Sequence, residues 1–163
     1  MKQPFRTGFG FDVHAFAKDR KLIIGGIEIP YDKGLLGHSD ADVLLHAICD
    51  AMLGALSLGD IGTHFRDTDL KYKDADSGEL LRIVNNMITE KGYTLSNLDA
   101  MVAIQKPKIA SFIPAMKANI SVILNCNEDQ VSIKASTTEK LGFIGREEGV
   151  SAFASVLLIN GAK

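Results

Sequence analysis

Polar and hydrophobic residues alternate with a period of two in several stretches of the chain, which is typical of β-strands. In the stretch 5–14 the phenylalanines fall on one face, and Gly8 and Gly10 share the other face with two polar residues. The glycines are predicted to leave room beside those polar side chains. Further strands are predicted over 22–24 and 27–29, which flank a Gly-Gly pair as a hairpin, and over 98–105, 131–135 and 150–159.

A period near 3.6 appears first between about 40 and 58, where apolar residues recur at helical spacing. Ser39 or Asp40 is predicted to cap this helix, because a short polar side chain can accept from the free N–H groups of the first turn. The polar segment 60–73 that follows contains Gly62 and is predicted to be a loop.

Two further helices are predicted. One begins at Asp76 and ends at Gly92, and the other spans 113–124 with Pro114 in its first turn. Three helices beside four to five strands, without a repeat or a linker, favour an α+β fold in which the sheet packs on the helices. We expect a single domain over residues 1–163.

Composition and charge narrow the class of protein. A chain of 163 residues that is 46% hydrophobic can bury a core without disulfides, and Cys49 and Cys126 are expected to be reduced residues in apolar surroundings. The net charge of -2 is scattered, which argues against nucleic-acid binding. The N-terminus lacks a signal-peptide core, and no apolar run approaches the ~20 residues of a membrane span. A cytoplasmic protein without membrane contact is therefore expected.

Asp12 and His14 are candidate metal ligands, because the single residue between them on a strand points both side chains the same way. His46 lies on the first predicted helix, and Asp42 precedes it by one turn on the same face. A catalytic zinc ion takes about three protein ligands and leaves one position open. Spacing leaves Asp12 and Asp42 as alternatives beside the two histidines, and ordinary polar pairs as a third interpretation.

Five blocks of sequence carry more information than spacing does. They are GFDVH at 10–14, GLLGHSDADVLLH at 34–46, GDIG at 59–62, FRDTD at 65–69 and KASTTEKLGF at 134–143. In this order, over nearly the whole chain, they resemble the 2-C-methyl-D-erythritol 2,4-cyclodiphosphate synthase family. The resemblance implies an α+β domain that assembles as a homotrimer, with each active site built between two subunits.

The resemblance also implies a reaction and its metals. The substrate would be 4-diphosphocytidyl-2-C-methyl-D-erythritol 2-phosphate, whose 2-phosphate attacks the β-phosphorus to give the cyclic diphosphate and CMP. Zinc would be held by Asp12, His14 and His46, with Asp42 orienting His46 by a hydrogen bond. A second ion, Mg²⁺ or Mn²⁺, would bind Glu139, because a carboxylate suits a hard cation.

Substrate contacts are implied in the same way. His38 and Ser39 would bind the 2-phosphate, with His38 and Thr137 stabilising the transition state, while Asp60 and the Ile61-Gly62 backbone would hold the erythritol hydroxyls. The remaining implied contacts are Asp12, His14, Phe65, Asp67, Thr68 and Asp69 near the sugar, Ile104, Gln105, Lys106, Pro107 and Lys108 around the cytosine and its phosphates, and Ser136, Thr138, Glu139, Phe143 and Arg146. Each segment also has an ordinary interpretation as a cap, a turn or a solvated charge cluster.

Arg146 resembles the family residue near the trimer axis that can meet a diphosphate, so an isoprenoid diphosphate is a candidate regulatory ligand there. The sequence departs from the family pattern at four positions. Phe9 stands where His is frequent, Ala41 replaces Gly, Arg66 replaces Pro, and Phe153 stands where an acid can occur near the axis. None of the four is a proposed ligand, and Phe153 makes an axial cavity more apolar.

Two other functions fit parts of the pattern. A zinc phosphohydrolase would attack the diphosphate with water, positioned by Asp60 or His38, and would release linear phosphates. A zinc-stabilised interaction module would need four closed ligands, commonly cysteines. The sequence offers three candidate ligands and no thiol among them.

Overall fold

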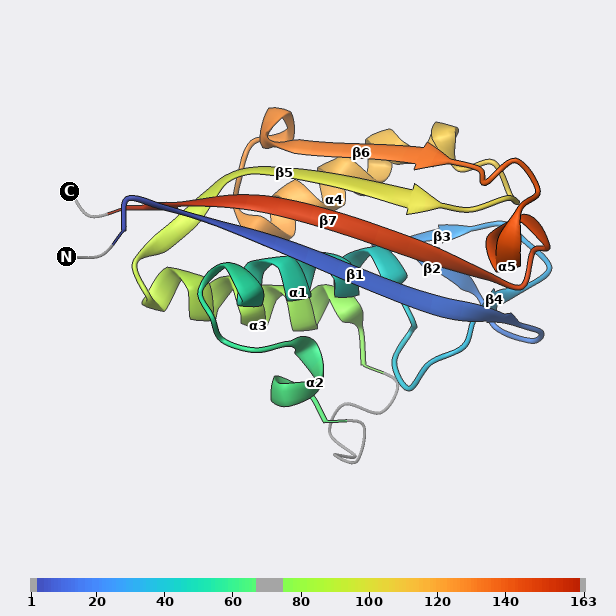
Figure 1. Ribbon diagram of the computed structural model, residues 1–163, viewed down its shortest axis with the longest axis horizontal. Helices are drawn as coiled ribbons and strands as arrows, with labels where there is room; N and C mark the ends of the chain where they lie inside the picture. The colour runs from blue at the N-terminus through green and yellow to red at the C-terminus, as the bar shows by residue number, and fades with distance from the viewer. Residues whose placement is uncertain (1–2, 67–74, 162–163) are drawn as a thin grey trace.

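The computed structural model describes residues 3–66 and 75–161, and its frame is a five-stranded sheet in the order β4-β1-β7-β5-β6 (Figure 1). Only β5 and β6 run parallel, while the other neighbouring strands are antiparallel. The strands are β1 Phe5–Ala17, β4 Gly34–Leu35, β5 Tyr93–Ala103, β6 Val131–Ser136 and β7 Gly149–Asn160. A separate hairpin of β2 (Leu22–Ile24) and β3 (Ile27–Ile29) confirms the prediction around the Gly-Gly pair.

Three long helices lie on one side of this sheet (Figure 1). They are α1 Val43–Ala55, α3 Ser77–Glu90 and α4 Ile113–Leu124, with short helices at α2 Ile61–His64 and α5 Gly142–Gly145 and 3₁₀ turns at Ala110–Phe112 and Glu128–Gln130. The predicted α+β class is confirmed. None of the helices among the described residues has the length and hydropathy needed to cross a bilayer.

The contact between β1 and α1 is unusually close because β1 has glycines where the helix crosses it. A Cβ atom at Gly8 would lie 1.8 Å from the carbonyl oxygen of Ala51, and one at Gly10 would lie 1.9 Å from that of Ala47. The space that the glycines leave is therefore filled by the helix backbone. This approach brings the side chains of α1 within reach of the polar residues that follow the glycines on β1.

The N-terminus of α1 is capped by Asp42, and not by Ser39 or Asp40 as predicted. The fully buried carboxylate of Asp42 accepts from the backbone N–H groups of Leu44 and Leu45. It also accepts from Gly25 and Gly26 at 3.0 and 2.6 Å, so the turn of the β2–β3 hairpin is fixed to the helix. Burial raises the pKa of Asp42 to about 6, against the opposing effect of these hydrogen bonds.

The other elements follow the predictions in part, since β1 extends three residues beyond the predicted strand, α1 is shorter than predicted, and β4 and α5 were not predicted. Strand β5 begins at Tyr93 and not at residue 98, because an irregularity between Leu95 and Asn97 breaks the alternation there. The segment predicted as a loop contains α2, whose first turn is capped by Asp60. Helix α4 has the predicted bounds. Cys49 is buried and Cys126 half-buried, and both are free thiols as expected.

The opposite face of the sheet carries exposed apolar side chains. Phe9 and Phe11 on β1 are 66% and 46% exposed, and both rings pack against Phe153 of β7, with centroids 6.4 and 5.1 Å away. Met101 of β5 lies opposite Phe153 on the other side of β7. An apolar surface of this kind, which we call the phenylalanine face (Phe5, Phe9, Phe11, Met101, Phe153), marks an interaction site.

We expect Gly10→Ala to lower the free energy of unfolding by about 3 kcal/mol, because the added methyl forces β1 away from α1. Urea unfolding followed by circular dichroism measures it. Gly54→Ala is the matched control: Gly54 is an exposed glycine of α1, and a Cβ there meets nothing closer than 3.9 Å. The control is expected to gain up to about 1 kcal/mol. Equal stability of Gly10→Ala and the wild type would contradict the close packing.

Candidate functional site

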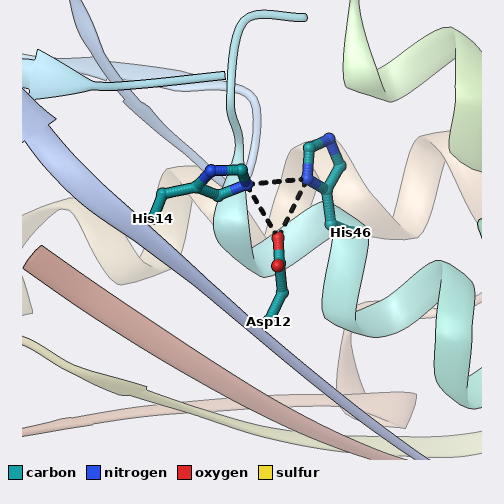
Figure 2. Close-up of side chains that lie close together, drawn as sticks. All are labelled: Asp12, His14 and His46. Atoms are coloured by element: carbon teal, nitrogen blue, oxygen red, sulfur yellow. Dashed lines mark hydrogen bonds and ion pairs between the residues drawn. The ribbon is translucent and has the colours of Figure 1, made fainter. Parts of the chain in front are cut away.

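Asp12 and His14 on β1 and His46 on α1 point their side chains at one another (Figure 2). Oδ2 of Asp12 lies 2.9 Å from Nε2 of His14 and 3.0 Å from Nδ1 of His46. The two imidazole nitrogens are 3.1 Å apart. The three atoms thus form a nearly equilateral triangle, built from residues 34 positions apart in the chain.

This donor set fits a divalent metal ion. It comprises one carboxylate oxygen and two imidazole nitrogens, a combination of ligand types that catalytic zinc takes. With metal–ligand distances of about 2 Å, tetrahedral ligands lie about 3.3 Å apart. The triangle needs to expand by only a few tenths of an ångström to reach that spacing. Among the described residues, this is the group of metal-ligating side chains that converges within one ion's reach.

Each histidine is held through its other ring nitrogen. Nδ1 of His14 lies 2.8 Å from the carbonyl oxygen of Leu36, which can only accept, so Nδ1 carries a proton and Nε2 is the nitrogen of a neutral His14 that can offer its lone pair to a metal ion. Nε2 of His46 lies 2.9 Å from Oγ of Ser77 and 3.3 Å from Oγ of Ser39. The prediction that Asp42 orients His46 is wrong, since the carboxylate of Asp42 accepts from backbone groups around the helix N-terminus.

The charges of the triad reinforce one another. Burial alone would raise the pKa of Asp12, but the hydrogen bonds from His14 and His46 outweigh it and hold that pKa far below its usual value. Burial would lower the pKa of His14, but the Asp12 carboxylate overcomes it and raises the pKa above 6.5. The metal-free site therefore favours an ionised Asp12 and a protonated His14.

The triad opens into a cavity of ≈ 250 Å³. Its wall brings together several of the predicted substrate contacts with the metal ligands, namely Asp12, His14, Gly37, His38, Ser39, His46, Ile61, Gly62, Phe65 and Leu80. Asp60 lies just before this wall and caps α2 by accepting from both the N–H and the hydroxyl of Thr63. The predicted contacts Asp67, Thr68 and Asp69 lie outside the described residues.

A second cavity, of ≈ 140 Å³, holds most of the predicted cytidine contacts. It is lined by Ile104, Gln105, Pro107, Lys108, Ile109, Ala110, Ala135, Ser136 and Thr137. Glu139 follows it on an exposed loop, where its carboxylate accepts from the hydroxyl of Thr137 at 3.2 Å. The residues that line the cavity lie at or just after the ends of β5 and β6, so the cavity lies two to three strand spacings, about 10–14 Å, across the sheet from β1.

Besides Asp60 and Glu139, four of the predicted contacts among the described residues lie outside both cavities. Lys106 forms an ion pair with Glu147 at 3.0 Å, and Arg146 pairs with Glu148 at 2.8 Å. The hydroxyl of Thr138 donates to the carbonyl of Leu141. The fourth, Phe143, lies in α5 and is 40% exposed. One chain therefore brings together some of the predicted contacts in two groups and leaves the others on the surface around α5.

Sequence reasoning missed the polar residues behind the site. Asp50, one turn after His46 on α1, accepts from the N–H of Ile61 at 2.7 Å and so fixes the start of α2. The spacing of four residues places Asp50 on the same face of the helix as His46, so the sequence could have indicated that Asp50 lies near the site. Ser77 has no such signal, because it lies 31 residues from the histidine that it contacts.

Comparison with known proteins places the chain among cyclodiphosphate synthases. Residues 5–159 match the YgbB family. The chain is 61% identical over 154 residues to the 2-C-methyl-D-erythritol 2,4-cyclodiphosphate synthase of Halalkalibacterium halodurans, which covers 94% of this chain and 98% of that protein. The protein of the same name from Bacillus licheniformis is 62% identical over 154 residues, with the same coverage.

Two solved structures of similar fold are a bifunctional protein and a complex with CDP. The bifunctional IspDF from Campylobacter jejuni has a TM-score of 0.92 at 47% identity and covers 96% of this chain, although this chain spans only 42% of that protein. The CDP complex of IspF from Plasmodium falciparum has a TM-score of 0.87 at 36% identity, and the two cover 99% and 100% of each other's length.

We expect zinc binding to weaken as the pH falls from 8 to 6. Zinc requires the lone pair of His14 Nε2, and the raised pKa of His14 means that a proton competes for it at higher pH than it would for a free imidazole. Below that pKa, each pH unit is expected to cost about tenfold in affinity per proton displaced. Asp12 stays ionised over this range and adds no dependence. Calorimetric titration of metal-free protein in buffers of different ionisation enthalpy counts the protons released, and a pH-independent affinity would contradict the expectation.

Proposed function

The chain belongs to the YgbB family, and we propose that Asp12, His14 and His46 form the zinc centre of its cyclodiphosphate-forming reaction. It is a lyase of the non-mevalonate pathway that makes 2-C-methyl-D-erythritol 2,4-cyclodiphosphate and releases CMP. The convergence of one carboxylate oxygen and two imidazole nitrogens at the edge of a cavity is the observation that carries the zinc proposal.

The chemistry demands positioning and charge neutralisation more than a strong base. An oxygen of the 2-phosphate forms a bond to the β-phosphorus, and the bond from that phosphorus to the bridging oxygen breaks, so that CMP leaves with the electron pair. The attacking oxygen is already an anion, and the obstacle is the repulsion between phosphates brought into line. A zinc ion held by Asp12, His14 and His46 would supply positive charge for the β-phosphate oxygens.

The residues around the triad are suited to hold the sugar and its 2-phosphate. His38 and Ser39 line the same cavity, so both can donate to a phosphate placed beside the triad. Both described bonds to Asp60 end on its Oδ1, which leaves Oδ2 to accept from a hydroxyl of the erythritol. Asp50 accepts from the N–H of Ile61 and so holds the start of α2 in place. The adjacent backbone of Gly62, which lines the same cavity, is then positioned to contact the substrate.

The second cavity is suited to the cytidine end. The backbone of 104–108 can read the base, and the hydroxyls of Ser136 and Thr137 and the ammonium of Lys108 can meet its phosphates. Glu139 is exposed beside Thr137 and offers the hard oxygen ligand that Mg²⁺ or Mn²⁺ prefers between the α- and β-phosphates. The cytidine diphosphate bound by the Plasmodium falciparum relative supports a cytidine site.

A homotrimer would join the two half-sites. Within one chain the metal triad and the cytidine cavity are separated by two to three strand spacings, an arrangement compatible with a substrate held by two neighbouring subunits. The phenylalanine face supplies the apolar surface for such an assembly. In the trimer, the triad of one subunit would face the cytidine cavity of the next.

An isoprenoid diphosphate near Arg146 stays a prediction. Its phosphates would have to compete with Glu148, which already accepts from the guanidinium of Arg146 through both carboxylate oxygens. A thermal-shift titration with farnesyl diphosphate tests it, and an unchanged melting temperature would refute it.

We expect His46→Ala to lose at least 100-fold in turnover while remaining folded, because the triad loses one of its three ligands. Phosphorus NMR of the cytidine-diphosphate substrate with Zn²⁺ and Mg²⁺ should show CMP and the cyclic diphosphate with the wild type. His64→Ala is the matched control, because it also removes a histidine, but one whose ring contacts the carbonyl of Leu58 and not the triad. It is expected to keep its bound zinc. Linear phosphates from the wild type would instead establish a hydrolase.

We expect Phe11→Asp to convert a trimer into monomers of 17.6 kDa, because a carboxylate cannot be buried unpaired within an apolar interface. Activity should fall with the loss of assembly. Val122→Asp is the control, since Val122 is 75% exposed on α4, away from the phenylalanine face. Analytical ultracentrifugation measures both variants, and a fully active wild-type monomer would contradict the shared site.

A further inference from the structure

The ring of His46 is held from behind by a chain of two polar residues. Its Nδ1 faces Asp12 and His14, and its Nε2 lies 2.9 Å from Oγ of Ser77. Ser77 is fully buried at the start of α3, and its hydroxyl donates a short hydrogen bond to Oδ1 of Asp40. The chain therefore runs from the triad through Ser77 to a carboxylate that contacts no member of the triad.

The chemistry of these groups fixes the direction of each hydrogen bond. An ionised carboxylate can only accept, so the single proton of the Ser77 hydroxyl points to Asp40. The oxygen of Ser77 is left as an acceptor toward Nε2 of His46, which must then carry the proton. When His46 is neutral, as metal binding requires, its lone pair is consequently on Nδ1, the atom that faces the two other ligands.

Asp40 also joins the chain segments that surround the site. Its Oδ2 accepts from the backbone N–H of Ser77 at 3.1 Å, and its own N–H donates to the carbonyl of Ala75 at 3.2 Å. Asp40 immediately follows His38 and Ser39, which line the triad cavity. The same side chain thus fixes the loop before α1, the start of α3 and, through Ser77, the ring of His46.

We propose that Asp40 and Ser77 are positioning residues for the metal centre, which set the proton of His46 on Nε2 and hold its ring so that Nδ1 is free to bind the ion. This inference rests on the proposed zinc centre and adds two residues that act on it from behind. Ser39 is a weaker candidate for the same role, because its hydroxyl lies 3.3 Å from His46 and already accepts from the N–H of Ala41 at 3.1 Å.

The test measures metal affinity, with Zn²⁺ in competition with a chelator and Co²⁺ by its visible absorption. Ser77→Ala is expected to bind both ions 10- to 100-fold more weakly than the wild type, with an altered Co²⁺ spectrum, since His46 loses its acceptor. Affinity within about twofold of the wild type would overturn the proposal. A wild type that binds neither ion would refute the zinc centre itself, so the two failures are distinguishable.

Two further variants separate positioning from simple stabilisation of α3. Asp40→Asn should also weaken binding, and adding it to Ser77→Ala should change affinity by less than about twofold, because Asp40 acts through Ser77. Asp76→Ala removes the side-chain cap of α3, which accepts from Gly78, without touching the chain to His46. This variant is expected to have a lower melting temperature than the wild type but the same affinity for Zn²⁺ and Co²⁺. Additive losses in the double variant, or an equal loss in Asp76→Ala, would overturn the proposal.

If Ser77→Ala does not fold, nitrogen-15 NMR of the zinc-loaded wild type decides the question. The proposal requires a hydrogen on Nε2 of His46 that exchanges slowly with water, because it is buried in the bond to Ser77. A rapidly exchanging hydrogen on Nε2, or its absence, would refute the arrangement.

Discussion

The close packing of α1 on β1 is the constraint on which the rest of the structure depends. Gly8 and Gly10 allow the helix backbone to approach the strand where any Cβ atom would collide with a carbonyl oxygen. The next residues on the same face of β1 are Asp12 and His14, and the approach brings His46 of α1 to within about one hydrogen-bond length of both. The arrangement of the triad is therefore a consequence of backbone contacts that β1 makes at Ala47, the residue after His46, and at Ala51, about one turn further along the helix.

Polar residues near the N-terminus of α1 stabilise the triad in two different ways. Asp42 is buried and satisfies four backbone N–H groups from the helix and the β2–β3 turn, so it fixes the position of the helix and not the orientation of a ligand. Asp40 and Ser77 reach the ring of His46 from the other side. The two aspartates have separate tasks although they are two residues apart.

The sheet has two functional faces with different chemistry. One face packs on the helices and holds the triad, in which the ionised carboxylate of Asp12 favours positive charge beside it. The other presents aromatic side chains that a single chain leaves partly exposed. The second cavity lies at the ends of β5 and β6, toward the edge of the sheet that is far from β4.

The sequence by itself determined the strand and helix types, the bounds of α4, and the shared direction of Asp12 and His14, because these follow from periodicity and local turn chemistry. The five motif blocks indicated the family. Through the family they also favoured Asp12 over Asp42 as a ligand. Only the tertiary structure brought Asp12 beside His46, assigned the helix cap, and revealed the contact of Ser77 with His46. Those outcomes depend on packing between residues 16 to 34 positions apart, and local sequence carries no information about such contacts.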